Sequence, residues 1–114
     1  MHHENRRESR RASLDIYLNK YVGGVPYLTR TADISPQGIR LATLIEPSHD
    51  ARKVGLQFQL PGSSEVIYAE GEIVREWERG ASCEGSSIRF TLLTERHRKQ
   101  IANFVRAHAP QLAA

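Results

Sequence analysis

The clearest alternation of apolar and polar residues in this sequence runs Val54-Gly55-Leu56-Gln57-Phe58-Gln59-Leu60 and is followed by Pro61-Gly62. Because successive side chains of a strand point to opposite faces, the pattern predicts a strand with one face in the core and one in water. Proline followed by glycine is typical of a turn, since proline restricts φ and glycine accepts a positive φ. A half-buried strand of this kind indicates an antiparallel sheet.

Segments with the same period of two flank this strand on both sides. On the N-terminal side, the sequence predicts one strand over residues 14–22 and a second over residues 25–34. Gly23-Gly24 between them is typical of a tight hairpin, because glycine adopts the positive φ that such turns require. Further strands are predicted over residues 39–43, 66–77 and 86–92, and the second of these is long enough to contain a bulge near Gly71.

The C-terminal part changes to a helical period. Thr94 is a predicted N-cap and Glu95 stands in the first turn. Apolar and aromatic residues follow at helical spacing, namely Ile101, Phe104, Val105 and His108, and Pro110 ends the segment. The sequence therefore predicts a mainly β fold: six antiparallel strands in a barrel or sandwich, followed by an α-helix over about residues 94–108.

The size and composition of the chain limit its class. With 114 residues, 39% hydrophobic and 25% charged, the chain is predicted to form one domain over residues 13–109. No apolar run approaches the roughly 20 residues of a membrane span, so we expect no membrane insertion. The lone Cys83 cannot form an internal disulfide, which favours a cytoplasmic location. The net charge of +3 favours anionic partners.

Residues 1–12 are polar and show no period, so they are predicted to form a flexible basic arm. This arm contains the four arginines Arg6, Arg7, Arg10 and Arg11. Their guanidinium groups are suited to planar, bidentate hydrogen bonds with phosphate oxygens and with the N7 and O6 atoms of guanine. The alternative interpretation is a solvated basic tail without a ligand.

A turn motif follows the second strand and reads Asp33-Ile34-Ser35-Pro36-Gln37-Gly38. The carboxylate of Asp33 can accept hydrogen bonds from N1–H and N2–H₂ of guanine, which adenine does not offer in the same pattern. Gly38 has two predicted roles, either a positive φ or the close approach of a ligand to the backbone. Together with the arginine arm, the motif predicts a site for a small anionic ligand that contains guanine.

Arg6-x-x-x-Arg10 followed by Asp33-x-Ser35-x-x-Gly38 resembles the signature of PilZ domains, the bacterial receptors for cyclic di-GMP. The resemblance covers nearly the whole chain and implies a six-stranded β-barrel with a C-terminal helix. It also implies a ligand-binding set of Arg6, Arg7, Arg10, Asp33, Ser35 and Gly38. The arginine pattern fits equally one residue later, as Arg7-x-x-x-Arg11, so Arg11 is a further candidate and the register stays open.

Trp77 and Arg79 are additional candidate ligand contacts. At positions i and i+2 of a strand they would share one face, where the indole could stack on a guanine and the guanidinium could meet a phosphate. The alternative is a barrel-edge aromatic residue beside an exposed arginine. The residues do not decide between the two interpretations.

The resemblance predicts a second-messenger receptor that orders its arginine arm on cyclic di-GMP and then acts on a partner protein in trans. Nothing indicates an enzyme, a metal or a cofactor, because no histidine is positioned by sequence to activate Ser35 and no ligand set has the usual metal spacing. One alternative is a PilZ-like adaptor that binds a protein and not a nucleotide. Nonspecific nucleic-acid binding is disfavoured by the few aromatic residues. The sequence does not indicate the oligomeric state or the number of ligands bound.

Overall fold

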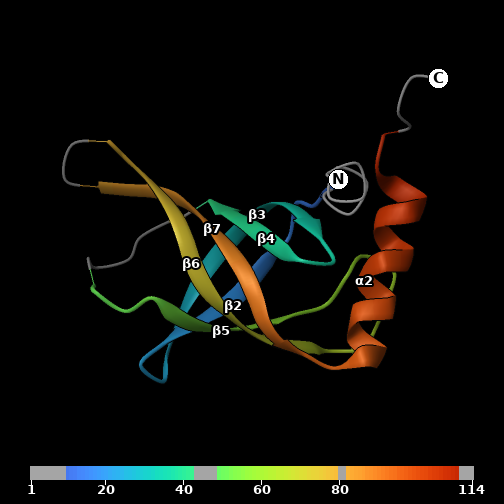
Figure 1. The fold of residues 1–114 in the computed structure, drawn as a ribbon, viewed down its shortest axis with the longest axis horizontal. Coiled ribbons are helices and arrows are strands. Elements are labelled where there is room, and N and C mark those ends of the chain that lie inside the picture. Colours follow the sequence, from blue (N-terminus) through green and yellow to red (C-terminus); the bar gives the residue numbers. More distant parts are fainter. Residues whose placement is uncertain (1–9, 43–48, 80–81, 111–114) are drawn as a thin grey trace, which may run out of the picture.

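A computed structural model describes residues 10–42, 49–79 and 82–110 of the chain (Figure 1). Its strands are β1 (Ala12–Ser13), β2 (Tyr17–Val22), β3 (Val25–Ser35), β4 (Gly38–Ala42), β5 (Lys53–Phe58), β6 (Ile67–Arg79) and β7 (Ser82–Leu93). One helix, α2 (Glu95–His108), follows β7. No helix in these ranges is long and apolar enough to cross a membrane.

The strands form a closed antiparallel barrel, which confirms the predicted fold class. Neighbouring strands follow the order β3-β2-β5-β6-β7-β4, and the pairing of β3 with β4 closes the ring. Within the described ranges, six strands form this barrel, and the short β1 lies outside it and pairs with the end of β3. Gly23 and Gly24 have φ of 58° and 82°, as the predicted hairpin requires. The predicted bulge near Gly71 is also present, because the pairing of β6 with β7 shifts there.

The predicted first strand, over residues 14–22, is a strand only from Tyr17 to Val22 (β2), and the short β1 precedes it. Thr31 of β3 explains the interruption between β1 and β2. Its buried hydroxyl accepts a hydrogen bond from Ile16 N at 2.9 Å and donates to Leu14 O at 2.6 Å. These backbone groups lie between β1 and β2, where regular pairing with β3 is interrupted. The threonine side chain therefore replaces hydrogen bonds that a continuous first strand would make with β3.

We expect Thr31→Val to lower the free energy of unfolding by about 1–3 kcal/mol, because valine keeps the volume but leaves Ile16 N–H and Leu14 C=O without their partner. Urea denaturation measures this change. Thr29→Val is the matched control, since Thr29 is equally buried but its hydroxyl donates only to Tyr27 O, at 3.3 Å. Equal losses in the two variants would contradict the role assigned to Thr31.

The core fills the interior of the barrel. The alternating residues Val54, Leu56 and Phe58 of β5 are 4%, 0% and 3% exposed, as their pattern predicted. They pack with inward side chains of the other strands and of the helix, including Leu18, Ile34, Ile39, Leu41, Ile67, Ile73, Ile88, Ile101 and Val105. The helix therefore covers a part of the core that the strands leave open.

Helix α2 packs against β1 and β3 and stands to the right of the barrel in Figure 1. Thr94 is the N-cap, and its hydroxyl accepts from His97 N at 3.2 Å. Glu65 binds the first turn through Arg96, at 2.7 Å, and this guanidinium lowers the pKa of the Glu65 carboxyl. Farther along, Arg98 donates to Pro36 O at 3.0 Å, so the helix also supports the turn between β3 and β4.

Candidate functional site

The turn motif joins β3 to β4 and places Asp33 and Ser35 at the end of β3. Gly38 begins β4 and pairs with both Ser35 and Arg89. Its φ is not positive, since the described glycines with positive φ are Gly23, Gly24 and Gly62. The prediction of a positive φ at Gly38 is therefore wrong. A Cβ atom there would lie 2.2 Å from Ile88 O, so glycine is needed because the backbone of the paired strand β7 lies directly against this position.

Arg11 connects the three characteristic positions of the turn motif. Its Nε donates to Asp33 Oδ1 in a very short contact, its Nη1 donates to Ser35 Oγ at 3.2 Å, and its Nη2 donates to Gly38 O at 3.4 Å. The side chains of Arg11 and Asp33 are 27% and 21% exposed, so this ion pair is partly shielded from water. One guanidinium thus holds the motif together at the point where β1 meets β3.

Asp33 also faces Arg40, its partner residue on β4. Arg40 Nη1 lies 3.4 Å from Asp33 Oδ2, so both carboxylate oxygens have a guanidinium neighbour. The guanidinium carbon of Arg40 lies 5.9 Å from the centre of the Trp77 ring, and that of Arg75 lies 5.3 Å from it. These distances are typical of cation–π contacts. Arg40 and Arg75 are both exposed on the outer surface of the barrel.

Trp77 is positioned by the neighbouring strand. It pairs with Gly85 of β7, and a Cβ atom on Gly85 would lie 3.2 Å from Cε3 of the indole. The missing side chain lets the ring lie against the backbone of β7, so Trp77 is half-buried and still belongs to the outer face. A surface that we call the Asp33 face therefore comprises Arg11, Asp33, Arg40, Arg75 and Trp77.

The structure places only part of the predicted set at the Asp33 face. Arg6 and Arg7 lie outside the described residues, as does the side chain of Arg79. Arg10 does not contact the turn motif, and its Nη2 donates instead to Pro110 O at 3.4 Å. Arg10 is the second arginine of one register and Arg11 that of the other. In this structure it is Arg11 that contacts the turn motif.

Sequence reasoning did not select Arg40 and Arg75. A weak indication existed, because Arg75 precedes Trp77 by two residues on a predicted strand and would share its face. Arg40 joins the group only because β4 pairs with β3 on one side and is separated from β6 by β7 alone on the other. The period of a single strand does not reveal which strands are its neighbours. Among the described residues, no group of three or more His, Cys, Asp or Glu side chains is placed to hold a metal ion.

Comparison with solved structures identifies neighbours that share this fold. The inhibitor of motility MotI/DgrA of Bacillus subtilis superposes with a TM-score of 0.73 and 14% identity, over 86% of this chain and 48% of that chain. Our chain thus spans about half the length of that neighbour. The PilZ domain of YcgR from Escherichia coli, solved with cyclic di-GMP, superposes with a TM-score of 0.62 and 13% identity, over 86% of this chain and 87% of that chain.

Sequence comparisons are consistent with these neighbours. No curated protein sequence matches the chain significantly. Among protein families, residues 5–107 match the PilZ domain, a range that includes the four arginines of the arm, the turn motif, the barrel and almost all of α2. The chain therefore belongs to the PilZ domain family.

Proposed function

We propose that this chain is a receptor for cyclic di-GMP and that the ligand binds to the Asp33 face. The observation that carries the proposal is the convergence of three guanidinium groups, one carboxylate and one indole on that surface. Arg11 and Arg40 flank Asp33, while Arg40 and Arg75 lie over Trp77. The presence of cyclic di-GMP in the structure of the YcgR domain, which has the same fold, supports the choice of ligand.

The chemistry of the ligand matches these groups. Its two phosphates need several cationic donors, and planar guanidinium groups bind phosphate oxygens in a bidentate manner. Asp33 provides the acceptor for N1–H and N2–H₂ of one guanine. Trp77 provides an aromatic surface on which a base can stack, a contact worth about 1–3 kcal/mol per base. The other predicted role of Gly38, close approach of the ligand to its backbone, stays a prediction.

Arg11 must change partners when the ligand binds. In this structure its guanidinium occupies Oδ1 of Asp33, one of the two carboxylate oxygens that a guanine would use, together with Ser35 Oγ. We propose that guanine replaces Arg11 at Asp33 and that the released guanidinium turns to a ligand phosphate. A partly buried carboxylate without a partner is costly, and this exchange keeps Asp33 hydrogen-bonded in both states.

The arginine arm supplies the remaining contacts in this proposal. Arg6, Arg7 and Arg10 precede Arg11, and a chain of this kind can fold over a ligand held at the Asp33 face. Ordering such a segment costs on the order of a few kcal/mol, which charge-assisted hydrogen bonds to phosphates can offset. We propose that the ordered arm changes the surface offered to a partner protein in the cytoplasm, and that the chain itself has no catalytic activity.

A second candidate is an adaptor that binds a protein without a nucleotide. The contacts of Arg11 favour it, because they satisfy Asp33 and Ser35 within the chain itself. Isothermal titration calorimetry with cyclic di-GMP separates the two candidates. We expect saturable heat with cyclic di-GMP and much weaker binding of cyclic di-AMP, whose adenine lacks the N1–H and N2–H₂ donors. Absence of heat at tens of micromolar cyclic di-GMP would favour the adaptor and refute the receptor.

The register of the arginine motif is tested by Arg11→Ala and Arg10→Ala. We expect Arg11→Ala to weaken cyclic di-GMP binding about tenfold or more, because its guanidinium is already at the turn motif. Arg10→Ala should have a smaller effect, since Arg10 contacts Pro110 instead. Arg30→Ala serves as the control, because Arg30 pairs with Asp15 at 2.7 Å, outside the Asp33 face. A larger loss in Arg10→Ala than in Arg11→Ala would establish the Arg6/Arg10 register.

A further inference from the structure

A row of paired residues crosses the Asp33 face from strand to strand. Asp33 on β3 pairs with Arg40 on β4. Ser87 on β7 pairs with Arg40 on one side and with Arg75 of β6 on the other. Residues directly opposite each other on antiparallel strands have their side chains on the same face of the sheet. The row therefore places a serine between two arginines, and this serine belongs to neither the turn motif nor the arginine arm.

The burial of β7 shows that Ser87 faces outward. Its neighbours Ser86 and Ile88 are 1% and 2% exposed and belong to the inner face of the barrel, whereas Ser87 is half-buried. Among the described residues, the hydroxyl of Ser87 has no hydrogen-bond partner, so its donor is available to a ligand.

A bulge in β6 brings Arg75 to the same face. Ile73 is 2% exposed and pairs with Ile88 inside the barrel, so strict alternation would direct Val74 outward and Arg75 inward. The pairing of β6 with β7 shifts between Ile73 and Arg75, and both Val74 and Arg75 are exposed. A bulge adds one residue to a strand and redirects the side chain that follows. The bulge therefore returns Arg75 to the outer face, beside Ser87.

The two guanidinium groups beside Ser87 retain hydrogen-bond donors. Their carbon atoms lie 5.9 Å (Arg40) and 5.3 Å (Arg75) from the centre of the Trp77 ring, so both groups are held near one indole. Arg40 Nη1 points to Asp33, at 3.4 Å, but a guanidinium has five N–H donors in all. Several donors therefore remain for an anion that lies between the two arginines.

Neighbouring carboxylates leave this surface positive. Glu76 follows Arg75 in the sequence but pairs with Arg52, at 3.1 Å, and Glu72 pairs with Arg89. Within the described part of the chain, Arg75 itself makes no ion pair. The surface around Ser87 therefore has a local excess of positive charge, which favours an anionic group.

We propose that Ser87, Arg40 and Arg75 form a phosphate-binding subsite, and that it takes one phosphate of cyclic di-GMP. The inference rests on the proposed function, because it assumes that a guanine binds Asp33. Adjacent strands lie about 4.8 Å apart, so Ser87, two strands away, is about 10 Å from Asp33. One guanosine phosphate unit has a comparable length from the N1 edge of its base to its phosphate. It reaches from Asp33 to Ser87 with Arg40 between them.

The position of the subsite also fits the aromatic surface. Trp77 pairs with Gly85, which precedes Ser87 by two residues on the same face of β7, or about 7 Å along the strand. A phosphate at Ser87 therefore lies between a guanine at Asp33 and the indole of Trp77. The phosphates of cyclic di-GMP connect its two nucleosides, so the order of these groups on the protein matches the order base, phosphate, base along the ligand.

Ser87 is a specificity-determining residue in this arrangement. Its short side chain leaves room for a tetrahedral phosphate between two guanidinium groups, and its hydroxyl adds a donor to a phosphate oxygen. Because the subsite lies at a fixed separation from Asp33, the barrel wall selects a guanine and a phosphate at that separation. An isolated anion or an isolated base meets only one of the two conditions.

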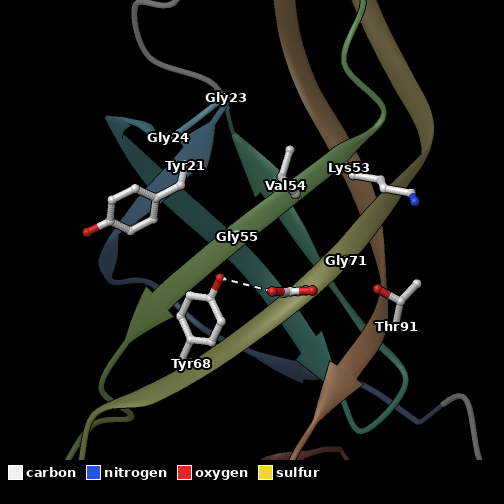
Figure 2. Close-up of a pocket in the computed structure, with 10 residues that line it drawn as sticks. Tyr21, Gly23, Gly24, Lys53, Val54, Gly55, Tyr68, Gly71 and Thr91 are labelled. Atoms are coloured by element: carbon white, nitrogen blue, oxygen red, sulfur yellow. Dashed lines mark hydrogen bonds between the residues drawn. The ribbon is translucent and has the colours of Figure 1, made fainter.

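Two substitutions at one position test the contact by calorimetry with cyclic di-GMP. Ser87→Ala removes only the hydroxyl and should weaken binding about tenfold, because it loses a hydrogen bond to a charged group. Ser87→Thr keeps the hydroxyl and should bind within about threefold of the parent. The matched control is Thr91→Ala, since Thr91 is an exposed residue of the same strand that lines a separate hollow with Lys53 and Tyr68 (Figure 2). The control should bind within about twofold of the parent.

A sulfur-substituted ligand identifies the atoms that Ser87 contacts. In the phosphorothioate analogue of cyclic di-GMP, one non-bridging oxygen of each phosphate is replaced by sulfur, which is a weaker acceptor. We expect the parent to bind this analogue about fivefold more weakly than cyclic di-GMP, and the loss to be smaller in Ser87→Ala, because residues in contact are not additive. A purely structural role of Ser87 would make the loss equal in the two proteins.

The subsite is also tested without a nucleotide, which separates it from the proposed function. Inorganic phosphate is titrated at low ionic strength into isotopically labelled protein and followed by NMR. We expect saturable shifts of the Ser87 amide signal and of the side-chain N–H signals of Arg40 and Arg75, with little change at Thr91. These shifts in a chain that gave no heat with cyclic di-GMP would refute the proposed receptor and support the phosphate subsite.

Other results would overturn the inference and leave the proposed function intact. Equal affinity of Ser87→Ala and the parent for cyclic di-GMP would do so. An equal loss in Ser87→Ala and Ser87→Thr would show that the hydroxyl is not the group that matters. Absence of phosphate-dependent shifts at Ser87 would remove the subsite, whatever the affinity of the chain for cyclic di-GMP.

Discussion

Asp33→Ala should weaken cyclic di-GMP binding by at least about a hundredfold, to the point where calorimetry detects little heat. The substitution removes the only carboxylate of the Asp33 face and with it the acceptor for guanine N1–H and N2–H₂. Hydrogen bonds to a charged group contribute about 1.5–3 kcal/mol each, and two of them account for a loss of this size. The remaining arginines should retain a weak, salt-dependent attraction for the phosphates.

Asp15→Ala is the matched control for Asp33→Ala. Asp15 is also a carboxylate paired with an arginine, Arg30, which lowers its pKa through a hydrogen bond, but it stands outside the Asp33 face. We expect its binding of cyclic di-GMP to remain within about twofold of the parent, as exposed pairs contribute little. If Asp33→Ala retained affinity within a few-fold of the parent, or lost cyclic di-GMP and cyclic di-AMP binding equally, Asp33 would not be the guanine acceptor.

Gly38→Ala should lower the free energy of unfolding by about 3 kcal/mol, although it adds one methyl group. The new Cβ would lie 2.2 Å from Ile88 O, an atom of the backbone that cannot rotate away, so β4 and β7 would have to separate. Because these two strands belong to the closed ring, the shift would spread to the pairing of β4 with β3. Urea denaturation followed by fluorescence of the single tryptophan, Trp77, measures the change.

Gly55→Ala provides the comparison for this effect. Its new Cβ would meet Tyr68 Oη at 3.0 Å, and that side chain is exposed and can move. We expect a change within about 1 kcal/mol. If Gly38→Ala changed the free energy of unfolding as little as Gly55→Ala is expected to, Gly38 would be replaceable in the fold and its place in the turn motif would have another cause, such as the approach of the ligand.

Local features of this protein were predictable because they depend on neighbouring residues. Alternation along β5 identified its buried face, Gly23-Gly24 identified a hairpin, and Thr94 identified the start of α2. Each of these patterns depends on a local backbone preference or on a side chain that hydrogen-bonds within its own segment. Predicting the element therefore requires no knowledge of the remaining chain. The turn motif belongs to this group, since its residues lie close together in sequence.

Features that depend on pairing between distant strands were not predictable in the same way. Thr31 interrupts the first strand from across the sheet, and Gly38 is constrained by a backbone fifty residues away. The two roles that the sequence predicts for Gly38 are a positive φ and ligand approach, and neither involves the neighbouring strand β7. A single sequence contains no record of which strands are neighbours, so these constraints appear only when the barrel closes.

The same distinction between local and long-range features applies to the candidate site. The sequence by itself determined the types of group available: an arginine-rich arm, a turn with a carboxylate and a hydroxyl, and a tryptophan on a strand. The tertiary structure alone decided that Arg11 and not Arg10 meets Asp33, and that Arg40 and Arg75 lie over Trp77. The physical reason is that residue type and local period are properties of the chain, whereas the register between strands arises from long-range hydrogen bonding and core packing.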